Sequence, residues 1–311
     1  VLGEDVARTG GVFRVTSGLL DKFGDERIVD TPLAEAGIVG SAIGMAVYGL
    51  LPVVEIQFDV FVYPGFEQIV VHAARYAWRT KGEVPASLVV RIPFGGGVRA
   101  PELHSDSPEA LFAHVPGLKV VCPTTPADAR TMMLAAIEDP DPVIFMEPKR
   151  IYRAGREEVP ESPPFRLGGS NGTYNEYLSK ARTAREGTDL AIITYGATLP
   201  LSLQAADRLE SERGVSVRVV DLRSLFPLDV DAIVAAASEC GRALVVHEAP
   251  RTAGIGAEVS SLIHERAMLD LEAPVGRVTG YDVPFPQFAN EDDYLPSVER
   301  IVAGANKVLD F

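Results

Sequence analysis

This sequence is poor in cysteine, in basic charge and in long apolar runs, and each shortage excludes a class of protein. Its two cysteines, Cys122 and Cys240, lie far apart in apolar segments, so we expect reduced core thiols rather than a disulfide framework. Only 29 basic residues stand against 43 acidic ones, which gives a net charge of −14 without any basic run. A nucleic acid or an anionic membrane is therefore an unsuitable partner, and a partner with a basic docking surface is favoured.

No apolar run is long enough for a membrane span. The longest candidate, residues 38–54, is interrupted by three glycines and Pro52 and falls short of the ~20 residues that a spanning helix needs. No signal peptide is visible, so we expect a protein of the bacterial cytoplasm or, in a eukaryote, of the mitochondrial matrix. The chain begins at Val1 within a strand-like stretch, and we expect residues to precede it.

Short apolar runs alternate with longer helical patterns along the chain. In the first half the runs are continuous, which is typical of parallel strands covered on both faces. The expected strands are 27–30, 51–58, 87–93, 118–123 and 142–147, and the expected helices are 34–49, 64–80, 107–113 and 126–138. This order predicts an α/β protein with a doubly wound parallel sheet.

The span from 149 to 188 is charged, rich in proline and glycine and poor in periodic apolar residues, as is typical of a link between domains. We therefore predict a first domain over 1–150, a linker over 151–187 with an insertion near 165–178, and a smaller α/β domain over 188–311. The strands expected in the second domain are 189–196, 216–222, 242–248 and 276–282, and its helices are 198–212, 229–239, 256–268 and 296–309.

Residues 30–49, DTPLAEAGIVGSAIGMAVYG, are predicted to form a helix that carries a single acid, Glu35, in its first turn. Pro32 suits the first helical position. The residues after Glu35 carry no charge, so we expect the helix to be buried on every side, and Gly40 and Gly44 allow other backbones to approach. Glu35 has two interpretations: it complements the helix dipole, or it is a functional carboxyl at the mouth of a buried helix.

The loop FGGGVRAPELHSDS, residues 94–107, is the second unusual stretch. In open α/β sheets ligands bind beyond the carboxyl ends of the strands, where this loop is expected to lie. Its glycines predict mobility, and His104 comes shortly before Ser107 and Pro108, a predicted helix start. His104 is either an exposed loop side chain or a group placed to meet an anionic substrate.

Three shorter motifs are weaker evidence for a function. GGSNG at 168–172 matches a nucleophile elbow, and Ser170, Asp221 and His247 follow the hydrolase order, but the motif lies in the linker rather than between a strand and a helix. The Gly-Ile-Gly at 254–256 lacks the third glycine of a dinucleotide loop. His247 and the acid after it have no second histidine at zinc-ligand spacing. A serine hydrolase is thus an alternative from another class.

Five longer stretches carry a resemblance that covers nearly the whole chain. They are GEDVARTGGVFRVTSGL, DTPLAEAGIVGSAIGMAVYGLLPVVEIQF, ELHSDSPEALFAHVPGLKVVCP, AAIEDPDPVIFMEPKRIYR and DLRSLFPLDVDAI. Together they resemble the beta subunit of the thiamine-diphosphate-dependent 2-oxo acid dehydrogenases. The resemblance implies a pyrimidine-binding thiamine diphosphate domain, followed by a transketolase C-terminal-like domain. The family's Gly-Asp-Gly motif for diphosphate and Mg²⁺ is absent from this sequence, so the resemblance implies that an alpha subunit holds that half of the cofactor.

The resemblance gives Glu35 and His104 catalytic roles. Glu35 matches the acid that activates the cofactor, because a carboxyl pushed toward its protonated form by an apolar pocket can hydrogen-bond the pyrimidine ring. His104 matches the histidine that steers the substrate carboxylate or donates a proton during transfer to the lipoyl group. Leu33, Gln57 and Phe61 match pyrimidine-contacting positions, and Phe61 replaces a common tyrosine, so ring stacking survives without a hydroxyl hydrogen bond.

The resemblance also implies ions and partners. A monovalent cation such as K⁺ would be held by oxygen donors, mostly of the main chain, at Ala86, Leu88, Val89, Ala136, Asp139 and Asp141. The alpha subunit would complete an α₂β₂ heterotetramer. A lipoyl acyltransferase core with a basic subunit-binding domain would dock on the C-terminal domain, near Phe311.

Two stretches bear on the substrate. EPKRIYR and RVTGYDVPFP resemble the branched-chain enzymes more than the pyruvate enzymes. We therefore predict a beta subunit that takes part in oxidative decarboxylation of branched-chain 2-oxo acids and reductive acylation of lipoyl groups, active only with an alpha subunit. Pyruvate or acetoin enzymes are the alternatives within the class. A non-catalytic assembly subunit is the alternative outside it, and the intact Glu35 and His104 argue against it.

Overall fold

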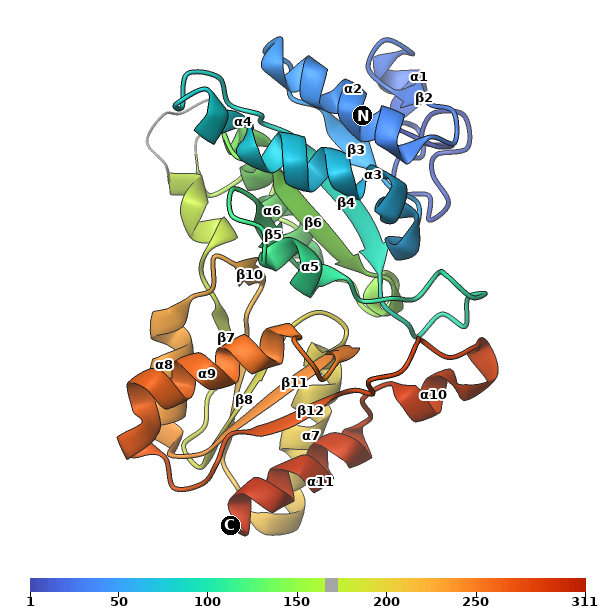
Figure 1. The fold of residues 1–311 in the computed structure, drawn as a ribbon. Helices are drawn as coiled ribbons and strands as arrows, with labels where there is room; N and C mark the ends of the chain where they lie inside the picture. Colours follow the sequence, from blue (N-terminus) through green and yellow to red (C-terminus); the bar gives the residue numbers. More distant parts are fainter. Residues whose placement is uncertain (166–172) are drawn as a thin grey trace.

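The computed structural model describes residues 1–165 and 173–311, which form two α/β units stacked one on the other (Figure 1). The first unit is built on a seven-stranded sheet in the order β10-β5-β6-β4-β3-β1-β2. Its strands are β1 (Leu2–Gly3), β2 (Val29–Asp30), β3 (Val53–Glu55), β4 (Val89–Phe94), β5 (Lys119–Val121), β6 (Val143–Pro148) and β10 (Ser224–Phe226). Strand β10 pairs antiparallel with β5, and the other pairings of this sheet are parallel.

Helices cover both faces of the first sheet. They are α1 (Leu19–Phe23), α2 (Glu35–Val47), the 3₁₀ turn η1 (Asp59–Val62), α3 (Tyr63–Glu67), the π-helical turn η2 (Gln68–Ala73), α4 (Ala74–Arg79), α5 (Glu109–Ala113), α6 (Pro126–Glu138) and the 3₁₀ turn η3 (Lys149–Ile151). Ile38 of α2 belongs to the same buried cluster as Ile92 of β4, whereas Met132 of α6 belongs to the cluster of Val89. Because Val89 and Ile92 point to opposite faces of their strand, α2 and α6 pack on opposite faces of the sheet.

The second unit has a five-stranded sheet in the order β12-β11-β8-β9-β7. Its strands are β7 (Arg182–Arg185), β8 (Leu190–Thr194), β9 (Val217–Asp221), β11 (Ala243–Pro250) and β12 (Gly276–Gly280). Its helices are α7 (Thr198–Arg213), α8 (Val230–Cys240), α9 (Ile255–Ala267), η5 (Met268–Asp270), η6 (Phe288–Asn290), α10 (Glu291–Tyr294) and α11 (Val298–Leu309). Ile192 of β8 packs in the cluster of α7 and α11, and its neighbour Ile193 packs in the cluster of α8 and α9, so this sheet is also covered on both faces.

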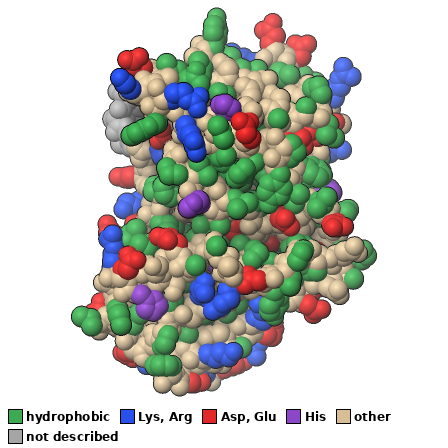
Figure 2. All heavy atoms as spheres, viewed as in Figure 1, with side chains coloured by type: hydrophobic (Ala, Val, Ile, Leu, Met, Phe, Trp, Pro, Cys, Tyr) green, Lys and Arg blue, Asp and Glu red, His purple; other side chains and the backbone are tan. Residues whose placement is uncertain are grey.

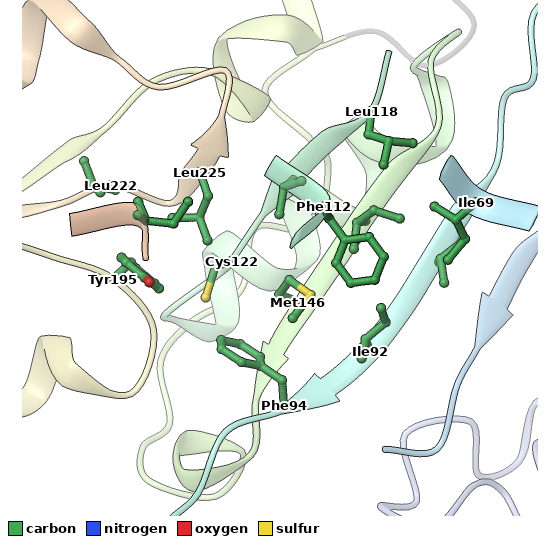
Figure 3. Close-up of a cluster of buried hydrophobic side chains, with 14 of the residues drawn as sticks. Ile69, Ile92, Phe94, Phe112, Leu118, Cys122, Met146, Tyr195, Leu222 and Leu225 are labelled. Atoms are coloured by element: carbon green, nitrogen blue, oxygen red, sulfur yellow. The ribbon is translucent and has the colours of Figure 1, made fainter. Parts of the chain in front are cut away.

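One buried cluster runs through both units. In Figure 3, Phe94, Cys122 and Met146 of the first unit lie beside Tyr195 of the second unit and Leu225 of β10, and all five belong to this cluster. Strand β10 reinforces the junction, because it belongs to the second half of the sequence but pairs with β5 of the first sheet. The two halves therefore share a core instead of being joined only by a linker.

The predicted α/β class with a parallel, doubly covered sheet is confirmed, and every predicted strand or helix range contains a strand or helix. Two strands were missed. Strand β7 lies inside the predicted linker, and its polar sequence RTAR suits the edge of a sheet better than an apolar run. Strand β10 is only three residues long. The domain limits at 150 and 187 stay a prediction.

Helix α2 differs from its prediction. Six of its residues, including Glu35 and Ile38, are buried, but Gly37, Ser41 and Gly44 on the other side are exposed. The prediction that it is buried on every side is wrong for this chain alone, because no other element of the described chain covers the small-residue face.

Cys122 and Cys240 are free and buried, as predicted. Among the described residues no helix has the length and apolarity of a membrane span. Of the predicted insertion, residues 166–172 lie outside the described residues, and Thr173–Leu178 forms the 3₁₀ helix η4.

Candidate active site

Glu35 is the first residue of α2, where α3 packs closely against this helix. A Cβ atom at Gly65 of α3 would lie 3.1 Å from the Glu35 carbonyl oxygen, so a glycine there lets the two helices approach. Glu35 is only 7% exposed. Within the described chain its carboxyl forms neither a hydrogen bond nor an ion pair. An unpaired carboxyl in this position is suited to a ligand that supplies the partner.

Two further polar groups lie near Glu35 because the strands β3, β1 and β2 are neighbours and parallel. Glu4 follows β1 directly, and Gln57 follows β3. The Gln57 amide nitrogen donates to the Asp5 carboxylate at 3.1 Å and to the Glu4 carbonyl at 3.4 Å. Burial, with the nearby charge of Glu35, raises the pKa of Glu4, and its buried Oε1 has no hydrogen-bond partner in the described chain.

Glu4 is a site residue that sequence reasoning missed. The available signal was its place directly after the first strand, within the stretch GEDVARTGG. Gln57, in contrast, was predicted, and the structure brings it to the same edge of the sheet. Leu33 lies before α2 and is 80% exposed, so it is not packed into a pocket of this chain.

His104 lies in an aromatic cluster rather than in open solvent. Its ring is 4.3 Å from that of Phe58 and 5.0 Å from that of Phe61, both in edge-to-face arrangement. Nδ1 of His104 lies 2.8 Å from the carbonyl oxygen of Glu102, which favours a proton on that nitrogen. The structure thus brings together two predicted residues, Phe61 and His104, that the sequence places far apart.

Contacts from the second unit hold the beginning of the His104 loop. The Gly96 N–H donates to the carboxylate of Glu248, and the Gly97 N–H donates to that of Glu291. Burial raises the pKa of Glu248 to about 7. A Cβ at Gly96 would lie 2.6 Å from the ring of Phe285, so the glycine is needed for close packing. The prediction that the glycines serve mobility does not account for these contacts.

A buried network fixes the strand ends beneath the site. Arg91 on β4 forms two hydrogen bonds with Glu147 on β6, at 2.7 and 2.8 Å, and pairs with Glu55 on β3. Burial by itself would lower the pKa of Arg91, but the two carboxylates outweigh it and raise that pKa. Tyr152 donates to Glu147 at 2.5 Å. This network ties three adjacent strands together where the site residues emerge.

The predicted cation site contains a lysine. The Lys119 ammonium pairs with the buried Asp139 carboxylate and lies 3.4 Å from that of Asp141. The carbonyl oxygen of Leu88 accepts from the Val143 N–H at 2.9 Å. Since Lys119 already supplies positive charge to both carboxylates, the donor set fits an added monovalent cation only in part. No group of three metal-binding side chains is present in the described ranges.

The residues of the hydrolase alternative do not form a triad in the described chain. Ser170 lies outside the described residues. Asp221 accepts hydrogen bonds from Thr124 and Arg182. His247 is fully buried and stacks on Tyr195 with ring centroids 5.9 Å apart, and burial lowers its pKa to about 4. Asp221 and His247 are therefore engaged separately.

Comparison with known proteins agrees with this architecture. Residues 1–155 match the family described as "Transketolase, pyrimidine binding domain", and residues 179–301 match "Transketolase, C-terminal domain". The solved structure of a "Split gene transketolase, inactive beta4 tetramer" covers 100% of this chain and 91% of its own, with a TM-score of 0.75 and 25% identity. The fold thus defines a two-domain subunit of the transketolase type.

Relatives that are similar over the full length identify the family within the transketolase type. Proteins named "Pyruvate dehydrogenase E1 component subunit beta" are 49% identical in Bacillus subtilis and 47% identical in Staphylococcus aureus, each over 100% of this chain and 92% of the relative. The protein of that name in Acholeplasma laidlawii is 44% identical over 99% of this chain and 91% of its own length. The chain belongs to the family of E1 beta subunits of 2-oxo acid dehydrogenases. Membership implies thiamine diphosphate as the cofactor.

Proposed function

We propose that this chain is the beta subunit of a pyruvate-type 2-oxo acid dehydrogenase component and works only with an alpha subunit. The observation that carries the proposal is Glu35, a largely buried residue at the start of α2 whose carboxyl has no partner in the described chain, in a chain that aligns fully with beta subunits. The names of the relatives favour pyruvate over the branched-chain substrates suggested by EPKRIYR and RVTGYDVPFP.

Glu35 is the residue that fits the aminopyrimidine end of thiamine diphosphate. When bound, the cofactor supplies the carbanion and the electron sink for decarboxylation. The Glu35 carboxyl would form a hydrogen bond with a pyrimidine ring nitrogen. Phe61 and Gln57 would contact the ring from the segment that follows β3, and exposed Leu33 is free to reach a ligand at the subunit boundary.

His104 would act on the substrate side. Its ring is held by Phe58 and Phe61, and the contact with Glu102 leaves Nε2 to meet a substrate carboxylate or to pass a proton during acyl transfer to the lipoyl group. The intact Glu35 and His104 support a catalytic subunit over an assembly subunit.

The exposed surface of the first unit supports a partner subunit. Tyr48, which follows α2, and Trp78 of α4 are 87% and 89% exposed, and the small-residue face of α2 is also uncovered in this chain. Figure 2 shows hydrophobic side chains spread over the upper unit on the face drawn there. An α₂β₂ assembly would cover such surface, and the alpha subunit would hold Mg²⁺ with the diphosphate. The net charge of −14 suits a basic subunit-binding domain of a lipoyl acyltransferase. K⁺ at Ala136 and Asp139 stays a weaker proposal because of Lys119.

The test is co-expression with a candidate alpha subunit, addition of thiamine diphosphate and Mg²⁺, and comparison of kcat/KM for pyruvate and 2-oxoisovalerate. We expect pyruvate to be used more efficiently, and no turnover by the beta chain alone. Greater efficiency with 2-oxoisovalerate would restore the branched-chain interpretation. Absence of turnover with either substrate in an assembled, cofactor-loaded heterotetramer would contradict the proposal.

A further inference from the structure

Two buried charges, Lys149 and Asp59, lie beneath the His104 loop. Lys149 follows β6 and Asp59 follows β3, so each emerges from the carboxyl end of its strand. The Lys149 Nζ is 2.7 Å from Oδ2 of Asp59, and both side chains have no exposed surface. Since burying an ion pair carries a desolvation cost, the other contacts of the two side chains indicate what the pair does.

Each member of the pair also holds the main chain of the loop, on opposite sides of Ser105, the residue after His104. The Lys149 ammonium donates to the carbonyl oxygen of His104. Oδ1 of Asp59 accepts from the Asp106 N–H at 2.9 Å. The loop is closed at its base by the Gly95 N–H, which donates to the Asp106 carbonyl oxygen at 2.9 Å. The pair therefore sets the backbone on both sides of Ser105.

The same pair bears on the imidazole ring through Phe58. The Lys149 Nζ lies 5.3 Å from the centroid of the Phe58 ring, within cation–π range. That ring lies 4.3 Å from the His104 ring. Lys149 thus contacts the main chain of His104 directly and its imidazole ring through Phe58.

We propose that Lys149 and Asp59 are positioning residues for His104. The buried pair fixes the backbone from 104 to 106 and, through Phe58, the plane of the imidazole. Neither side chain reaches solvent, so neither touches the substrate and both act through His104. The effect on catalysis rests on the proposed role of His104, whereas the effect on the loop does not.

The direct test is hydrogen–deuterium exchange of the loop in the assembled heterotetramer. The variant Lys149→Met leaves Asp59 buried without a counter-charge and can fail to fold, so the double variant Asp59→Leu with Lys149→Met removes both charges. We expect the amides around residues 104–106 to exchange at least about tenfold faster in the folded double variant. Lys180→Met, which removes an ion pair with Asp229 in the second unit, is the control and leaves this loop unchanged.

Catalysis supplies a readout that a purely structural role would not move. We expect kcat for lipoyl acylation to fall about 10- to 100-fold in the double variant, while the KM for the 2-oxo acid changes little. Lys149→Arg keeps a cation that can reach Asp59, and it should recover part of the rate.

The outcomes separate the two proposals. Parental exchange of the loop in the folded double variant overturns the positioning role. Faster exchange with an unchanged acylation rate supports the loop anchor and overturns the catalytic role of His104.

Discussion

The ring of Phe61 lies 5.0 Å from the imidazole of His104, edge to face. The family resemblance assigns these residues to different tasks, one to the cofactor pyrimidine and one to the substrate. Because the two rings are in contact, the residues assigned to the cofactor and to the substrate lie on the same side of the candidate site. A change in the ring at position 61 is therefore expected to affect both cofactor binding and the orientation of His104.

Phe61 is the first position to test. Phe61→Ala removes the edge contact, and we expect weaker thiamine diphosphate binding together with a loss of kcat of about fivefold, from an aromatic pair worth about 1 kcal/mol. Phe61→Tyr keeps the ring and should retain parental activity. Calorimetric titration of the heterotetramer with the cofactor measures the first effect. Equal affinity of both variants for thiamine diphosphate would contradict a contact between Phe61 and the cofactor.

Glu35→Gln should nearly abolish turnover while the heterotetramer still assembles. The amide cannot donate the carboxyl proton, and a positioned acid contributes about 10²- to 10⁴-fold. Steady-state kinetics and size-exclusion chromatography measure the two properties. Glu26→Gln, at an exposed position, is the matched control. Near-parental turnover of Glu35→Gln would contradict the assigned role.

His104→Ala should slow lipoyl acylation more than decarboxylation assayed with an artificial electron acceptor. We propose that the ring acts at the substrate side, and its removal leaves the Glu35 region intact. His264→Ala is the control, because that histidine is exposed on α9 and bonded only to the helix carbonyl of Ser260. An equal loss in both assays would assign His104 to decarboxylation itself.

Arg91→Met should destabilise the fold without a direct effect on the chemistry. The change leaves Glu55 and Glu147 buried without a counter-ion, and breaking such a pair costs about 3–5 kcal/mol. Chemical denaturation measures the free energy of unfolding. Arg208→Met, which removes an exposed pair with Glu212, should cost far less because water screens that pair. Similar losses in the two variants would contradict the importance of the buried network.

Glu248→Gln should change how stability depends on pH. Burial raises the pKa of Glu248 from 4.5 in its unfolded state to about 7, so the folded state binds a proton that the unfolded state releases. This contribution is fully present below pH 4.5 and is lost as the pH rises through about 7. The amide mimics the protonated form and still accepts from the Gly96 N–H. We expect the variant to gain stability relative to the parent, by roughly 2 kcal/mol, between pH 5 and pH 8. A constant difference over that range would contradict the shift.

The predicted elements held best where the chain repeats one pattern over many residues. Strands β4 and β6 are apolar throughout and buried throughout, so their sequences already contain the evidence for a sheet covered on both faces. Strands β7 and β10 were missed because a short or polar edge strand owes its existence to the neighbour with which it pairs. That neighbour lies about 40 residues away for β7 and about 100 residues away for β10.

The candidate site was predictable in part. Glu35 and His104 were singled out because an isolated acid on an uncharged helix and a histidine on a glycine-rich loop depart from the local pattern, and their roles stay a prediction. Glu4 was missed because its carboxyl matters only through the adjacency of β1 and β2, which folding creates. The glycines of the loop by themselves predicted mobility. The structure shows instead that Glu248 and Glu291 of the other unit bind the loop, and a local sequence pattern does not contain such contacts.

The sequence by itself therefore determined the α/β class and the family, and it marked Glu35 and His104 as candidate site residues, because these depend on residue type and on order along the chain. Only the tertiary structure decided which groups lie around those two residues. The Lys149–Asp59 pair spans 90 positions, and the carboxylates that bind Gly96 and Gly97 lie more than 150 positions away. Such contacts form when parallel strands bring their carboxyl ends to one edge, and local sequence patterns do not contain that information.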